Sequence, residues 1–521
     1  MSSHSWKRVI LGIVFLGLSF FYSVIFFQNA NFNQTMIFNI AHLKSLGNVF
    51  TSPINFNFWN HSGSLINIFS PWLTILSGWL FVNFNVTYGF SLYLGLITFV
   101  TLVSAYFYMN RFSNDTFESL LFSVIYAFSL NRFYQIFQQQ RLENYLVLIF
   151  LPMVYFGAYR FFKNQGWKNL VWGMLLIVWT APYMAIAVTI TLVPMFFLML
   201  FSKRSHHWRY WGRLILNSLV AIGLVFVTTI GFVGPLISQQ SQSNLEQNPI
   251  KNIDYSKWFN SLDFSKMQLF LLLAIGVLLS LLLLLIFLKS RFSYKVILLE
   301  MIPLTSLILV KFQISLVDIS RLIPAFQSIL DLFVAIVISR ILILVFQEGP
   351  GVLKLILVTV TVAGFMTLTY QQAAQIHPNK TIMSADKIDY QKFVWNYHDH
   401  AQNGQNQFLV NNKKASVSFY TKSNDYWVQY YNPTSADMDL PVQKYSGYKI
   451  QLNNENISTK LSKRNTLQLK TQPGKNIIEI HSRYDWIGIV CLLINLFGFI
   501  FLGYLSLKDI LWKNKKLPEN S

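Results

Sequence analysis

Charged side chains inside long apolar runs are the first residues here whose type and position suggest chemistry. Those within the runs are Glu143, Glu300, Asp331 and Arg340, and those near the ends are Arg132, Arg141, Lys311 and Arg321. A charge at mid-depth in a bilayer costs about 2.5–3.5 kcal/mol, so each needs a partner or a purpose. Asp331 and Arg340 are nine residues apart and face roughly opposite sides of one helix, so each needs its partner elsewhere.

Arg132, Arg141 and Glu143 lie close together in the sequence, around one predicted turn outside the membrane. They could line a polar pocket at the outer leaflet. They could equally form a mutual ion pair that locks two helix ends. The sequence leaves both interpretations open.

A second group of polar residues, His42, Lys44 and His61, lies in the first predicted outside loop. No Asp or Glu precedes Asp115. The loop therefore lacks the carboxylates that Mg²⁺ or Ca²⁺ prefers, and a general base there would have to be a histidine. Lys44 and the two histidines suit a lipid phosphate, although a loop histidine is commonly a plain hydrogen-bonding residue.

The sequence lacks the motifs that would indicate several common enzyme classes. The sequence has no Walker loop, GxGxxG turn, HExxH helix or GxSxG elbow. Its single cysteine, Cys491, excludes an intramolecular disulfide and a cysteine-based zinc site, and we expect no metal centre. The formal charge of +20 comes largely from basic residues that flank apolar runs, which indicates membrane orientation rather than nucleic-acid binding.

The elements that must position these residues are transmembrane helices, since 53% of the residues are hydrophobic and only 12% are charged. Basic turns should be cytoplasmic, which places both termini in the cytoplasm. Joining those turns predicts twelve crossings, at 9–27, 86–109, 117–133, 143–162, 170–182, 183–201, 214–237, 267–288, 296–312, 322–346, 355–372 and 486–507.

One further apolar run, 65–82, would invert every later basic turn if it crossed the membrane. Its Pro71, Gly78 and two tryptophans favour a re-entrant or interfacial helix. The alternative is a true span, with 170–201 then crossing only once.

The domain plan follows from these spans. We predict a transmembrane domain at 1–372 with its first outside loop at 28–85, an outside β-rich domain at 373–485, a last helix at 486–507 and a basic cytoplasmic tail at 508–521. Segments 415–420, 425–431, 448–452, 466–470 and 476–481 alternate or carry β-formers, which predicts a small antiparallel β-sandwich. Stretches 402–414 and 453–465 are predicted to be solvated loops.

Five local strings, taken in order, resemble a known family over nearly the whole chain. They are TMIFNIAHLKSL (35–46), NIFSPWLTIL (67–76), SLNRFY (129–134), RLENYLVLIFLP (141–152) and LPVQKYSGYKIQLNNENI (440–457). The sequence resembles the bacterial YfhO-like membrane proteins, with their relatives labelled as 6-pyruvoyl-tetrahydropterin synthase-related, and the plan of GT-C membrane glycosyltransferases. The resemblance implies an all-α polytopic bundle with a small extracellular β-sandwich before the last helix.

The resemblance also implies a function. A GT-C enzyme of the bacterial plasma membrane would move a sugar from a polyprenyl-phosphate carrier to a cell-surface glycan acceptor, among membrane lipids and without nucleic acid. Glu143 or His42 would be the base, with Arg132, Arg141 and Lys44 on the phosphate. The sequence departs from the family pattern at Thr35, where an acidic residue is expected, so no catalytic aspartate can be transferred.

The missing acidic residue favours an alternative from another class, a non-catalytic relative that binds lipid-linked glycan or scaffolds a partner. A transporter is a third possibility because intramembrane charges also mark ion pathways, although no pair of interrupted helices related by repeat symmetry is visible in the sequence.

Overall fold

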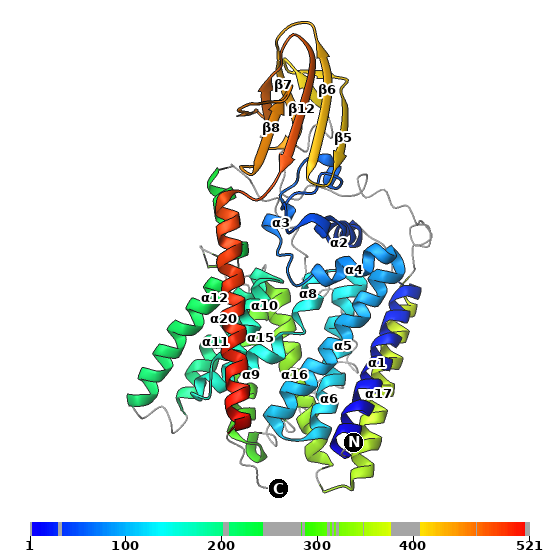
Figure 1. Ribbon diagram of the computed structural model, residues 1–521. Coiled ribbons are helices and arrows are strands. Elements are labelled where there is room, and N and C mark those ends of the chain that lie inside the picture. The colour runs from blue at the N-terminus through cyan, green and yellow to red at the C-terminus, as the bar shows by residue number, and fades with distance from the viewer. Residues whose placement is uncertain are drawn as a thin grey trace. The chain divides into compact units, whose positions relative to one another are not determined.

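The computed structural model describes residues 3–29, 34–201, 208–242, 283, 287–309, 313–314, 317–318, 322–346, 348–376, 407–464 and 466–515. These residues are mostly helical, with a small β-sheet region near the C-terminus (Figure 1). The chain divides into two compact units, each built from segments far apart in the sequence. The first contains Met1–Phe26, Gly95–Ala221 and Pro249–Ile376, and the second contains Phe27–Leu94, Ile222–Asn248 and His377–Ser521.

Eight of the described helical segments are long and apolar enough to cross a membrane. They are carried by α1 (Ser3–Asn29), α5 (Val86–Ser113), α6 (Thr116–Ala127) with its continuation to Gln138, α11 (Pro182–Leu200), α12 (Trp208–Gln242), α16 (Ile323–Val345), α17 (Gly351–Ala374) and α20 (Trp486–Lys515). This set is compatible with the predicted multi-pass membrane protein.

The predicted number of twelve crossings is not confirmed, because four of the predicted segments have no counterpart among these eight. Segment 143–162 contains two short helices, α8 (Leu142–Val147) and α9 (Leu151–Phe162), and 170–182 contains α10 (Lys168–Val178). Segment 296–312 falls in α15 (Phe292–Leu309), and 267–288 lies outside the described residues apart from 283, 287 and 288. The helix restarts at α9 because Pro152, which lacks an N–H, suits a first turn.

The apolar run from 65 to 82 forms two short helices rather than one long one. These are α3 (Ile66–Phe69) and α4 (Leu76–Phe84), of 4 and 9 residues. Pro71 lies between them and cannot continue a helical hydrogen-bond ladder. Neither helix approaches the roughly 20 residues of a crossing. The run is therefore not a spanning helix, in agreement with the prediction from the basic turns.

Close helix packing in the first unit depends on two glycines. A Cβ at Gly157 of α9 would lie 2.4 Å from the backbone nitrogen of Leu170, and one at Gly173 of α10 would lie 2.4 Å from Cγ2 of Val154. Larger residues at either position would push α9 and α10 apart. These two short helices therefore form a tight pair.

The predicted β-rich region is confirmed as two antiparallel sheets. Its strands are β3 (Phe408–Val410), β4 (Lys413–Ala415), β5 (Ser418–Lys422), β6 (Asp425–Asn432), β7 (Asp437–Gln443), β8 (Tyr448–Leu452), β9 (Glu455–Asn456), β10 (Lys460–Leu461), β11 (Thr466–Lys470) and β12 (Gly474–Ser482). One sheet has the order β10-β11-β7-β3-β4 and the other β5-β6-β12-β8-β9. Both contribute buried side chains to one core, as in a β-sandwich.

The period of two is visible in β6, where Tyr426 and Val428 are buried and Gln429 and Tyr431 are exposed. The prediction that 402–414 and 453–465 are solvated loops is partly wrong, because β3, β9 and β10 lie within them and β4 begins within the first of them. These strands have only two or three residues and rely on neighbouring strands for their hydrogen bonds, so their own sequences carry little β signal.

The first loop belongs to the same core as the sandwich. The Phe56 ring lies 5.4 Å from that of Tyr426 and 5.9 Å from that of Tyr448. The Gln443 backbone N–H donates to the Ser62 carbonyl at 2.7 Å. The loop and the β-sandwich, predicted as separate regions, therefore fold together in the second unit.

Candidate functional site

Arg132 lies in α7 (Leu130–Phe133), which continues into one π-helical turn at Tyr134–Gln138. The Ser129 hydroxyl caps this short helix, since it accepts from the Arg132 backbone N–H at 3.3 Å. The same hydroxyl donates to Oδ2 of Asp331 on α16 at 2.5 Å. The local turn that begins at Ser129 therefore fixes Arg132 beside α16.

The guanidinium of Arg132 retains unused hydrogen-bonding capacity. The residue is 0% exposed, and its guanidinium carbon lies 4.1 Å from the centre of the Tyr145 ring. Nη2 reaches Thr98 Oγ1 only at 3.5 Å, while Nε and Nη1 have no hydrogen-bond partner in the part of the chain that the structure describes. Leaving such donors unsatisfied costs about 1–3 kcal/mol, and more for a charged group. This arrangement suits a bound oxyanion such as phosphate.

Arg141 and Glu143 lie at the start of α8, where the chain folds back after the π-helical turn. Gln140 adopts a left-handed conformation (φ 55°), and the Arg141 N–H donates to the Gln135 carbonyl at 2.9 Å. The Asn144 amide also donates to the Gln135 side chain at 2.9 Å. Among the described residues, no salt bridge joins Glu143 to an arginine. The described residues therefore do not show the ion pair between Glu143 and an arginine that would lock the two helix ends.

His42 lies in α2 (Gln34–Ser45) and is 5% exposed. Its ring packs against Phe38 and Trp59, with centroid distances of 5.9 and 6.5 Å. Burial lowers the pKa of His42 to about 4, because the surroundings disfavour the charged form, and the nearby Asn67 side chain opposes this only in part. Among the described residues, neither His42 Nε2 nor Trp59 Nε1 has a partner within hydrogen-bond geometry. The imidazole is therefore neutral and enclosed.

Lys44 and His61 differ in how they are held. Burial lowers the pKa of the half-buried Lys44 ammonium. His61 Nδ1 lies 2.7 Å from the Phe56 carbonyl oxygen and 3.0 Å from Thr421 Oγ1 on β5. This nitrogen must donate to the carbonyl, so it is not available to a phosphate. His61 instead ties the first loop to the sandwich.

The predicted site residues thus fall into two groups. Arg132, Arg141 and Glu143 belong to the first unit, whereas His42, Lys44 and His61 belong to the second. The first group shares one folded-back segment, with contacts between the π-helical turn and α8. Each group is therefore a candidate site in its own right.

A buried ion pair that the sequence prediction missed links α6 to α16. Arg340 Nη1 donates to Glu118 Oε2 at 3.1 Å, and the Tyr294 hydroxyl donates to Oε1 at 2.6 Å. The Glu118 side chain is 0% exposed and that of Arg340 is 19% exposed. Glu118 lies near a helix start beside a basic turn, so its sequence position resembles that of a solvated residue. Arg340 was expected to need a partner outside its own helix, and Glu118 on α6 is that partner.

The Glu118–Arg340 pair and the Ser129–Asp331 bond lie near opposite ends of the same two helices. Residue numbers rise along α6 as they fall along α16, so the helices run in opposite directions. This agrees with the predicted topology, which sends 117–133 outward and 322–346 inward. Both polar contacts fix the register of this helix pair.

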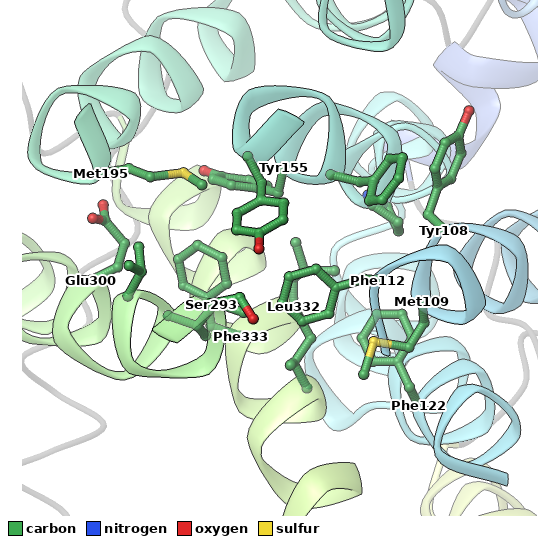
Figure 2. A pocket seen from close by; sticks show the side chains of 16 residues that line it. Tyr108, Met109, Phe112, Phe122, Tyr155, Met195, Ser293, Glu300, Leu332 and Phe333 are labelled. Atoms are coloured by element: carbon green, nitrogen blue, oxygen red, sulfur yellow. The ribbon is translucent and has the colours of Figure 1, made fainter. Parts of the chain in front are cut away.

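A small pocket in the first unit contains a second buried acidic side chain. Its volume is about 50 Å³, and it is lined by aromatic and aliphatic side chains, including Tyr108, Phe112, Tyr155 and Phe333. Figure 2 shows Glu300 beside Met195 at one end of this pocket. Glu300 is 1% exposed, and neither carboxyl oxygen has a hydrogen-bond partner among the residues that the structure describes. The pocket is too small for a typical small-molecule ligand.

No family model, curated protein or solved structure matches this chain. Within the described ranges, no group of three or more His, Cys, Asp or Glu side chains is arranged to hold a metal ion. The proposals for the function of this chain therefore rest on the geometry of its charged and aromatic side chains.

Proposed function

We propose that this chain is a GT-C-like, multi-pass protein of a bacterial plasma membrane that binds a polyprenyl-phosphate-linked sugar during cell-surface glycan assembly. The supporting observation is the Arg132 guanidinium, which is fully buried, held against Tyr145 and left with two unpartnered nitrogens. A lipid phosphate would accept a charge-assisted hydrogen bond from Nε or Nη1. The resemblance to YfhO-like proteins supports the class of ligand and an outer position for the β-sandwich.

Binding alone is the form of this proposal that we favour. In a transfer reaction, Glu143 would accept the proton of an acceptor hydroxyl, whose oxygen attacks the sugar's anomeric carbon while the carrier phosphate leaves with the bonding electrons. The first loop has no carboxylate, and its one enclosed histidine, His42, is 5% exposed. A non-catalytic protein that holds lipid-linked glycan needs neither group.

Binding of fluorescent polyprenyl phosphate to the purified chain in detergent tests this proposal. Arg132→Leu should abolish binding, and Arg132→Lys should weaken it because a point charge replaces a planar fork. Arg111→Leu is the matched control, since Arg111 also lies over an aromatic ring (Phe107, 3.9 Å) but at an exposed position. Equal binding by wild type and Arg132→Leu would refute the proposal. Transfer of a labelled sugar from the polyprenyl-phosphate donor to a glycan acceptor would show that the chain is also a catalyst.

A further inference from the structure

The outward face of the sheet β5-β6-β12-β8-β9 carries a continuous row of side chains. The strand register sets five residues opposite one another in order, Tyr420, Trp427, Glu479, Gln451 and Asn456. Neighbouring strands are about 4.8 Å apart, so four intervals span roughly 19 Å. We call these five residues the sheet row.

Two aromatic rings form one end of the sheet row. The Tyr420 and Trp427 rings are stacked, with centroids 5.4 Å apart and an interplanar angle of 26°. Tyr420 is 61% exposed. Tyr426 belongs to the sandwich core and Phe419 stacks on it, whereas the core does not include Tyr420 or Trp427. An exposed aromatic pair beside polar groups is typical of a recognition surface.

Hydrogen-bonding side chains form the rest of the sheet row, and their neighbours hold them in place. The Gln451 amide donates to Asn456 Oδ1 at 3.2 Å. His481 Nε2 lies 3.5 Å from Glu479 Oε2, and its Nδ1 lies 2.6 Å from Asp425 Oδ1. Side chains fixed in this way lose less conformational entropy when a ligand binds.

The formal charges on this face nearly cancel. The strand register places Lys422 opposite Asp425 and His481 opposite Lys449, in the row next to the sheet row. With Glu479, and with Lys475 exposed opposite Tyr431, the face has two carboxylates and three lysines. In the sheet row itself, Glu479 would repel a polyanion, whereas the hydroxyl groups of a neutral ligand can donate to it.

We propose that the sheet row binds a neutral oligosaccharide. Sugar rings present apolar C–H faces, which would stack on Trp427 and Tyr420, and hydroxyl groups, which would bond to Glu479 and the amides. The row is long enough for a chain of several sugar units. The inference deepens the proposed role in glycan assembly by naming a glycan surface, but it is carried by the sandwich alone and does not involve Arg132.

A glycan array probed with the full chain in detergent tests this inference, with the array composed of neutral oligosaccharides. Trp427→Ala and Tyr420→Ala should each weaken binding at least about tenfold, equivalent to about 1.4 kcal/mol. Tyr431→Ala is the matched control, because Tyr431 is 71% exposed on the same strand face but lies outside the row. Arg132→Leu should keep full glycan binding, which separates this inference from the lipid-phosphate proposal.

Each outcome of the glycan-array experiment either supports or overturns the inference. Loss in the two row variants with retention in Tyr431→Ala supports the inference, provided that the thermal unfolding temperature is unchanged. No glycan binding by the wild type, or equal binding by all the variants, overturns it. Binding of a single-stranded DNA probe through Trp427 and Tyr420, in preference to glycans, also overturns it.

Discussion

The buried contact between Glu118 and Arg340 leads to an asymmetric prediction about stability. Arg340→Leu leaves a carboxylate whose side chain is 0% exposed, with the Tyr294 hydroxyl as its remaining donor. Breaking a buried pair in this way costs about 3–5 kcal/mol. Glu118→Gln should cost less, about 1–3 kcal/mol, because Arg340 is 19% exposed and still lies 4.9 Å from the Tyr294 ring centre.

The double variant Glu118→Gln/Arg340→Leu removes both charges and leaves no ion unpaired. We therefore expect its free energy of unfolding to be no lower than that of Arg340→Leu alone. The assay is reversible denaturation in mixed detergent micelles, followed by tryptophan fluorescence. Arg111→Leu, which removes an exposed arginine, should change the free energy of unfolding by less than about 0.5 kcal/mol.

The loss of unfolding free energy in the double variant should be compared with the sum of the losses in the two single variants. If the two agree to within about 0.5 kcal/mol, the charges do not interact, and this reasoning is refuted. A larger loss for Glu118→Gln than for Arg340→Leu would also refute it, because the more exposed partner should tolerate isolation better.

Three other predictions concern single residues. Because burial lowers the pKa of His42 to about 4, the unfolded chain takes up a proton first as the pH falls from 6.5 to 4, so the free energy of unfolding should fall by roughly 3 kcal/mol across that window. The stability is fully present above pH 6.5, and His42→Gln should flatten this dependence in pH-resolved thermal unfolding. Ser129→Ala removes both the cap of α7 and the bond to Asp331, and should lower the free energy of unfolding by about 1–3 kcal/mol in chemical denaturation. Glu143→Gln should leave thermal stability and polyprenyl-phosphate binding nearly unchanged because Glu143 forms no salt bridge with another described residue, and a thermal shift of many degrees would contradict this.

Local patterns in the sequence predict local structure well here. Alternation at 425–431 predicts β6 and places Tyr426 and Val428 on the face opposite Trp427 and Gln429, because successive side chains of a strand point to opposite faces. The structure shows that the face with Tyr426 and Val428 is the inward one. The basic turns likewise predict that 65–82 does not span. Short strands such as β9 escape prediction because their partners, rather than their own residues, hold them in the sheet.

Contacts between distant segments are not visible in the sequence in the same way. Phe56 and Tyr426 lie hundreds of residues apart, and neither one's local sequence indicates that they share a core. The association of the first loop with the sandwich was missed for this reason. The sheet row was missed too, because it depends on the register of five strands rather than on the pattern within one.

The charged residues of the helical bundle show what the structure adds. The sequence identifies Arg132, Glu300, Asp331 and Arg340 as costly inside a bilayer but cannot separate them by role. Asp331 accepts a hydrogen bond from Ser129 and Arg340 pairs with Glu118, so packing of the bundle accounts for both. Arg132 and Glu300 keep buried polar atoms without a partner. A buried carboxyl group such as that of Glu300 can avoid this cost by holding a proton, whereas a guanidinium cannot. We therefore propose an anionic ligand only for Arg132, and the polyprenyl-phosphate assay tests it.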